Sequence, residues 1–159
     1  MSNRVTLSRY ELQMAAFVGT QRQLAAIVAN RPDRHGISQG DGWRAHIEGA
    51  CGEVAVAKFL GYYWDGSVDT FRSIPDLAGA EVRTRSSHEY DLLIRKDDDP
   101  EKVYILVTGR APTFWVHGWL RGKDAQREQW WKNHGNREWA WFVPSSALNT
   151  NWPKRLRTC

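Results

Sequence analysis

The residues best suited to chemistry lie in one stretch, residues 74–85. Polar and apolar residues alternate at its end, which predicts a strand with one wet face. Because successive side chains of a strand point to opposite faces, Glu81, Arg83 and Arg85 share one face. Carboxylates can hold a divalent metal, and cations can steady a phosphate or a developing charge. With Asp76 just upstream, this stretch therefore suits phosphate chemistry.

The spacing between Asp76 and Glu81 limits how these two carboxylates can share a metal. A fully extended chain of five residues spans about 16 Å, which is too far for one ion. Sharing therefore requires the chain to fold back at Ala78 and Gly79. Otherwise Asp69, on the preceding extended segment, is the better first ligand. Both aspartates are candidate metal ligands beside Glu81.

Helical spacing predicts two helices before this strand, at 9–29 and 43–60. Ser8 and Glu11 form the pattern of a capping box at the first helix, and Gly61 ends the second. Glu48 and Glu53 are five residues apart on the second helix, so they point in different directions. One of them should face inward, where a carboxylate is costly unless it is paired or bound to metal.

Most of the remaining elements are predicted to be strands, at 62–71 with a turn at Asp65-Gly66, 90–95, 103–108, 114–120 and 139–143. A short helix is expected at 123–134. Consecutive strands with helices before and between them predict an α/β (α+β) fold, with a mixed central sheet flanked by helices.

The composition is typical of a globular chain, and its mild positive charge is compatible with an anionic partner. The 159 residues carry 42% hydrophobic and 25% charged residues with a formal net charge of +4, and we expect one domain over 1–159. It divides into an N-terminal helix and loop (1–42), a core (43–143) and a C-terminal tail (144–159). The two cysteines form no disulfide framework, and no apolar run of about 18 residues occurs, which predicts a cytoplasmic protein outside the membrane.

Basic and aromatic residues offer a nucleic-acid surface. Seven of the nine tryptophans follow residue 114. Trp115, Trp119 and Trp130 could stack on unpaired bases, or pack in the core. The cations expected to grip phosphates are Arg31, Arg34, Arg85, Arg121 and Lys123. The five histidines show no zinc-ligand spacing.

A helix acid, a Pro-Asp pair and an acidic-x-basic strand, in this order of elements, resemble the PD-(D/E)XK nuclease superfamily over roughly residues 43–143. The resemblance implies an αβββαβ restriction-endonuclease-like core with an extra N-terminal helix. It implies Mg²⁺ (or Mn²⁺) held by Glu81 with Asp76 or Asp69, a helix acid at Glu53 (or Glu48), and hydrolysis of DNA. The chain is also similar to small uncharacterised phage proteins, which implies the host cytoplasm.

Arg83 stands where this superfamily has lysine, and a guanidinium stays protonated and cannot act as a base. Arg83 could stabilise charge in the transition state, and Lys58 or Lys96 is a candidate to replace the lysine. The alternative is an inactive nuclease fold that binds nucleic acid or a host protein. The charged strand face could also be a salt-bridged surface in which Asp91 pairs with an arginine. The partners we expect are DNA, then a host protein or a second copy of the chain.

Overall fold

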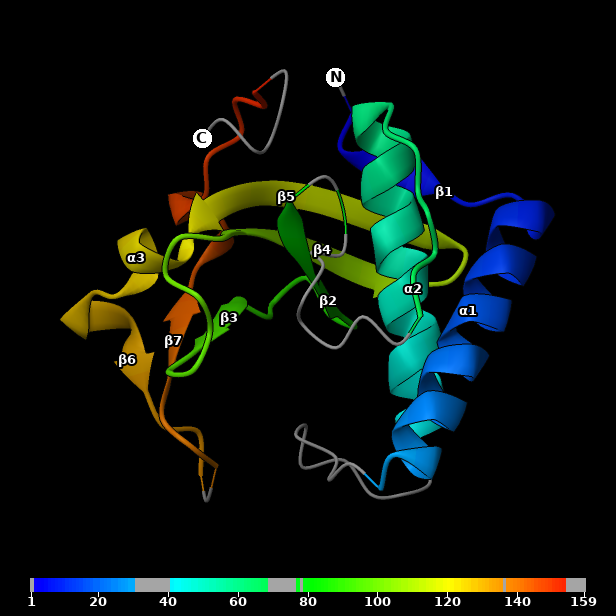
Figure 1. Cartoon of the computed structure of the whole chain (residues 1–159). Coiled ribbons are helices and arrows are strands. Elements are labelled where there is room, and N and C mark those ends of the chain that lie inside the picture. Colours follow the sequence, from blue (N-terminus) through cyan, green and yellow to red (C-terminus); the bar gives the residue numbers. More distant parts are fainter. Residues whose placement is uncertain (1, 31–40, 69–76, 78, 136, 154–159) are drawn as a thin grey trace.

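Two long helices begin and end close to the predicted positions. Helix α1 (Arg9–Val28) starts with the predicted capping box: the Glu11 backbone N–H donates to the Ser8 hydroxyl, and the Ser8 N–H donates to the Glu11 carboxylate. Helix α2 (Gly42–Leu60) ends at Gly61, whose φ of 69° is left-handed and favours glycine. Figure 1 shows α2 between α1 and the strands.

The computed structural model describes residues 2–30, 41–68, 77, 79–135 and 137–153. Within these ranges, no helix combines the length and the hydropathy that a membrane span requires.

The strands form two sheets. The larger sheet has the order β1-β5-β4-β2, built from β1 (Arg4–Thr6), β5 (Thr113–Arg121), β4 (Val103–Arg110) and β2 (Ala80–Arg85). Only the β2–β4 pair is parallel, so this sheet is mixed. The smaller sheet is antiparallel with the order β3-β7-β6, built from β3 (Leu92–Arg95), β7 (Ala140–Val143) and β6 (Trp131–Lys132).

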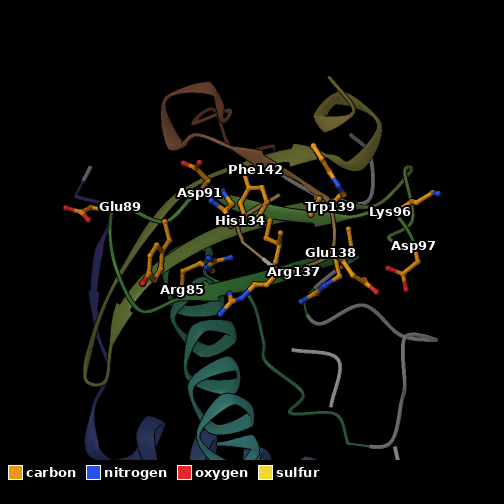
Figure 2. A pocket seen from close by; sticks show the side chains of 14 residues that line it. Arg85, Glu89, Asp91, Lys96, Asp97, His134, Arg137, Glu138, Trp139 and Phe142 are labelled. Atoms are coloured by element: carbon orange, nitrogen blue, oxygen red, sulfur yellow. The ribbon is translucent and has the colours of Figure 1, made fainter. Parts of the chain in front are cut away.

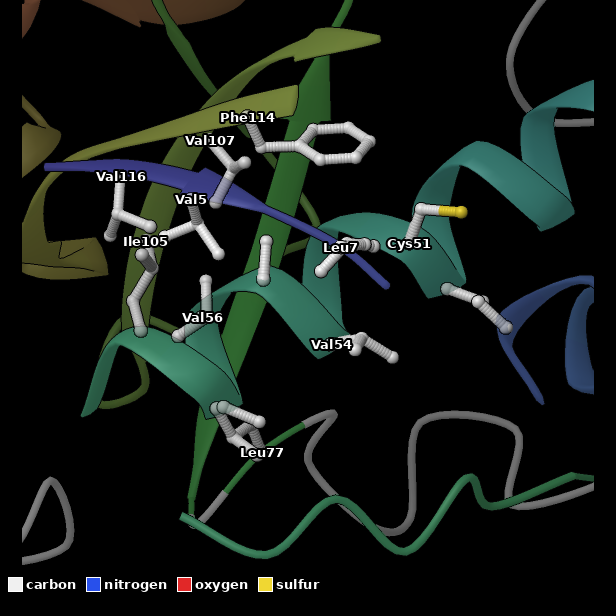
Figure 3. Close-up of a cluster of buried hydrophobic side chains, with 14 of the residues drawn as sticks. Val5, Leu7, Cys51, Val54, Val56, Leu77, Ile105, Val107, Phe114 and Val116 are labelled. Atoms are coloured by element: carbon white, nitrogen blue, oxygen red, sulfur yellow. The ribbon is translucent and has the colours of Figure 1, made fainter. Parts of the chain in front are cut away.

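Hydrophobic side chains cover both faces of the larger sheet. On one face a helix-side cluster joins α2 to the sheet and includes Val54, Ile105 and Phe114 (Figure 3). On the other face a sheet-side cluster joins the larger sheet to the smaller one and includes Leu92 and Leu106. Neighbouring residues of β4 therefore belong to opposite clusters, as the pleat of a buried central strand requires.

A β-bulge in β5 changes which residues face each cluster. The β4–β5 register passes from Val107↔Val116 to Leu106↔Gly118, so His117 is the extra residue. Val116 lies in the helix-side cluster, but Leu120 lies in the sheet-side cluster. One inserted residue thus reverses the alternation for the residues that follow it, while His117 itself lies on the sheet-side face, where its ring contacts Thr108.

The structure confirms the α+β class with a mixed sheet, but two predicted elements are wrong. Residues 62–68 contain no strand. The helix predicted at 123–134 is reduced to α3 (Gly122–Ala125) and the 3-10 turn η1 (Glu128–Trp130). Ala125 and Trp130 are both buried in the sheet-side cluster, and a straight helix would point residues five apart about 140° away from each other. The chain therefore breaks between them. A second 3-10 turn, η2 (Ser145–Ala147), follows β7.

The close approach of α2 to β2 depends on Gly52, a residue without a side chain. A Cβ placed on Gly52 would lie 1.9 Å from the Thr84 hydroxyl and 2.9 Å from its Cβ, whereas a Cβ on Gly49 would meet nothing within 4 Å. We expect Gly52→Ala to lower the free energy of unfolding by about 1–3 kcal/mol. Gly49→Ala, in the same helix, should raise it by about 0.5–1 kcal/mol. Chemical denaturation measures the free energy of unfolding of both variants. Equal effects of the two substitutions would contradict the close packing of Gly52 against β2.

Candidate functional site

Two ion pairs fix the charged side chains in the first part of the polar face of β2. The Lys102 ammonium lies 2.7 Å from the Glu81 carboxylate, and the Arg83 guanidinium lies 2.8 Å from the Asp98 carboxylate. Ala80 belongs to the helix-side cluster, so Glu81 and Arg83 face the sheet side, as the alternation predicts. The residues from Asp98 to Lys102 are thereby bound to β2.

Arg83 and Asp98 have further partners that fix this network. The Arg83 guanidinium carbon lies 5.2 Å from the centre of the Tyr104 ring, which is cation–π distance. Asp98 also accepts a hydrogen bond from the Arg95 backbone N–H at 2.8 Å. Burial, and next the Asp98 charge, raise the pKa of Tyr104, so its hydroxyl stays protonated. Arg83 is thus a structural cation whose charge is already matched.

Glu53 is the inward-facing acid of α2, and its partners come from the helix side. It is buried, and its two carboxylate oxygens accept from the Arg22 guanidinium at 2.5 and 2.9 Å. The Trp64 indole N–H also donates to it, at 2.8 Å. The two acids therefore lie on opposite faces of the larger sheet, and the structure does not bring Glu53 together with Glu81.

The remaining predicted metal ligands, Asp69 and Asp76, lie outside the described residues. The backbone next to Asp76 nevertheless reverses as a shared metal would require: Leu77 and Ala80 exchange both backbone hydrogen bonds, at 3.0 and 2.7 Å. Among the described residues, no group of three His, Cys, Asp or Glu side chains could hold a metal ion. The described carboxylates alone therefore do not fit a magnesium centre.

Arg85 differs from the other charged residues of β2 because it has no carboxylate partner among the described residues. Its guanidinium carbon lies 5.0 Å from the centre of the Tyr90 ring. Burial lowers the pKa of Arg85, against a smaller opposing effect of Tyr90. A partly buried guanidinium without an ion pair is costly to keep unless something else supplies the negative charge.

Arg85 lines a groove of about 1410 Å³ beside the smaller sheet (Figure 2). Four cationic and four acidic side chains surround this groove, so its charges balance. Its aromatic rings come from Tyr90, Trp139 and Phe142, and the first two are 46% and 54% exposed. The other lining residues are Glu89, Asp91, Leu93, Arg95, Lys96, Asp97, His134, Arg137, Glu138 and Ala140. Asp91 contributes charge near Arg85, but the two form no ion pair within 4 Å.

Two histidines meet at the fully buried hydroxyl of Thr108, which the β2–β4 register places beside Arg85. His88 Nδ1 and His117 Nε2 each lie 2.6 Å from the Thr108 Oγ1 atom. A hydroxyl has one hydrogen and two acceptor lone pairs, so at least one of the two ring nitrogens must carry a hydrogen and donate to it. The two rings are therefore coupled through Thr108, because the two facing nitrogens cannot both lack a hydrogen in this arrangement.

Sequence spacing could not reveal this His–Thr–His group, because its members lie 20 and 9 residues apart. The bulge at His117 and the loop after β2 bring them together. A threonine near the end of a buried strand, followed across a turn by an alternating Trp-Val-His stretch, is the only signal in the sequence.

The other predicted nucleic-acid contacts lie elsewhere. Arg121 and Lys123 both face Glu101, at 3.8 and 3.1 Å. Arg31 and Arg34 lie outside the described residues. Trp130 is buried in the sheet-side cluster, and the Trp119 indole N–H donates to the Asn151 carbonyl at 3.0 Å.

The His–Thr–His group should make stability depend on pH. Burial, and next the His88 charge, lower the pKa of His117. The unfolded chain therefore takes up a proton first as the pH falls through about 6.5, and the native state loses stability. We expect His117→Gln to reduce the loss in unfolding free energy measured between about pH 7.5 and pH 5.5. His134→Gln, on the exposed surface, is the control, and an unchanged loss in His117→Gln would contradict this role.

Comparisons of the chain with protein-family models, with curated proteins and with solved structures found no match. The relationship to the PD-(D/E)XK superfamily therefore stays a prediction.

Proposed function

We propose that this protein binds nucleic acid in the groove beside the smaller sheet, with Arg85 as its phosphate contact. The observation that carries the proposal is the contrast along β2. Glu81 and Arg83 are matched by Lys102 and Asp98, whereas Arg85 has no acidic partner among the described residues. A phosphate would supply the negative charge that pairs with this guanidinium.

The chemistry of Arg85 suits this role. A guanidinium presents planar donors that bind two phosphate oxygens at once, and it remains charged near neutral pH even when burial lowers its pKa. The Tyr90 ring below it restricts its orientation. Less conformational freedom is then lost when a phosphate binds.

The groove around Arg85 favours unpaired bases over a duplex. The exposed faces of Tyr90 and Trp139 can each take a base, and such stacking contributes about 1–3 kcal/mol per base. Carboxylates such as Asp91 and Glu138 can accept hydrogen bonds from base amino groups. Because the groove has balanced charge, few phosphates are neutralised, and binding should weaken only moderately with salt.

Binding to a labelled oligonucleotide tests this proposal. We expect the parent to bind an unpaired DNA strand more tightly than its duplex, and Arg85→Gln to weaken binding about tenfold, which corresponds to about 1.4 kcal/mol. The slope of log K against log salt should fall by about 0.7 when this one phosphate contact is lost. Arg121→Gln, whose native side chain faces Glu101, is the matched control and should bind like the parent. Equal binding by the two variants would contradict the assignment of Arg85.

Hydrolysis of the bound strand is a second candidate function, favoured by the lysine beside Glu81. The resemblance expects a lysine at position 83, and the structure places Lys102 from a neighbouring segment 2.7 Å from the strand acid instead. The reversal at Leu77–Ala80 also meets the condition for Asp76 to approach Glu81. Mg²⁺ or Mn²⁺, when bound, would activate water for attack on the phosphodiester. Since the described carboxylates alone do not fit the metal, Asp76 or Asp69 must complete its ligands.

A cleavage assay separates hydrolysis from binding. If the second candidate is correct, the parent cuts unpaired or duplex DNA with Mg²⁺ or Mn²⁺, EDTA stops it, and Glu81→Ala and Lys102→Ala abolish it. Glu101→Ala, which removes an exposed acid, should leave cleavage unchanged. Binding that survives in EDTA, with no cleavage in the presence of either metal, would contradict hydrolysis and support binding as the only function of the two. If the protein neither cleaves nor binds DNA, both proposals are contradicted and a protein partner is favoured.

A further inference from the structure

Helix α1 carries a continuous apolar stripe that the rest of the described chain leaves exposed. Its residues are Tyr10, Met14, Phe17, Leu24, Ile27 and Val28, which are between 42% and 85% exposed. Apart from Ile27, they follow the alternating four- and three-residue spacing of a helix–helix seam. Gln21 occupies the one position of that seam that is not apolar.

This stripe is separate from the contact that α1 already makes with α2. Ala15, Val18 and Gly19 are the buried residues of α1, and Arg22 beside them reaches Glu53. At 100° per residue, these side chains lie about 150° around the helix from the stripe. In Figure 1, α1 forms the edge of the molecule, with α2 between it and the strands. The stripe is thus a second apolar face of α1.

The size of the stripe fits a stable protein interface. Typical side-chain areas and the exposed fractions give roughly 650 Å² for its six residues. The largest apolar patch of a typical monomer is about 300–600 Å², and a standard interface takes about 800 Å² from each partner. The flanking residues of α1 supply most of the remaining area.

The charges of α1 favour a second copy over other occupants. A helix that lies on a membrane carries Lys and Arg beside its apolar face, but between residues 10 and 28 the only cation is Arg22, which binds Glu53. An uncharged stripe also offers nothing to attract a charged partner. It meets no like-charge repulsion from its own copy, and a polar residue within such a seam fixes the register of helix pairing.

We propose that α1 is a self-association helix, and that two copies of this chain pair through the stripe in a two-fold symmetric dimer. The same residues then lie on both sides of the interface, and the exposed aromatic rings of Tyr10 and Phe17 become buried. This proposal does not depend on the function of the groove.

Sedimentation equilibrium tests the dimer on the full chain. Interfaces of standard size have dissociation constants from micromolar to picomolar. We therefore expect the parent, at roughly 100 μM, to have twice the chain mass. Phe17→Glu should have the mass of one chain. Tyr63→Glu, the same kind of change at an 89% exposed position outside α1, should remain a dimer.

Tyr10→Glu provides a second disruption that preserves folding, because an acidic residue in the first helical turn favours the helix. It should also give single chains, with an unchanged circular dichroism spectrum. A parent that is monomeric at this concentration overturns the proposal, as does a dimer that survives both stripe variants. A monomeric parent that sediments with phospholipid vesicles would overturn it in favour of a lipid surface.

Discussion

The parallel pairing of β2 with β4 is the contact on which the rest of the structure depends. The two strands are in register from Ala80↔Val103 to Arg85↔Thr108. This register decides which side chains of β2 enter the helix-side cluster and which remain on the polar face. It also places each polar residue next to a particular neighbour on β4, so the chemistry of the face follows from strand pairing.

Along that face the electrostatic environment changes from one end to the other. At the start of β2, the charges of Glu81 and Arg83 are matched within the network, and the Tyr104 ring lies against the Arg83 guanidinium. At its end, Arg85 adjoins two histidines that are linked through the Thr108 hydroxyl. A matched network stabilises the fold and has little charge left for a ligand. The unmatched end retains its charge and opens into the groove, where an anionic ligand would be stabilised.

Local patterns in the sequence predicted the local structure well. The capping box at Ser8, the glycine end of α2 and the alternation of β2 each depend on residues close together in the chain. The inward orientation of Glu53 was predicted as one of two choices, because helical geometry forbids both acids from facing the same way. The helix expected at 123–134 failed because burial of Trp130 in the sheet-side cluster outweighed helical propensity.

Contacts between distant segments could not be predicted in the same way. Lys102 reaches Glu81 only because β2 pairs with β4 in parallel, and the sequence does not specify that register. The His–Thr–His group further requires an inserted residue in β5 and the loop after β2. The acidic-x-basic pattern therefore showed which side chains of β2 share a face, but it could not show that Arg83 is neutralised while Arg85 is not.

Of the two arginines on this face, we propose that Arg85, and not Arg83, meets the phosphate. Side-chain NMR of the arginine Nε–Hε groups, recorded while an unpaired oligonucleotide is added, tests it most directly. We expect the Arg85 signal, assigned with Arg85→Lys, to shift with the fraction bound, while the Arg83 signal stays in place because Asp98 holds that side chain. A shift of Arg83 with no change at Arg85 would contradict it.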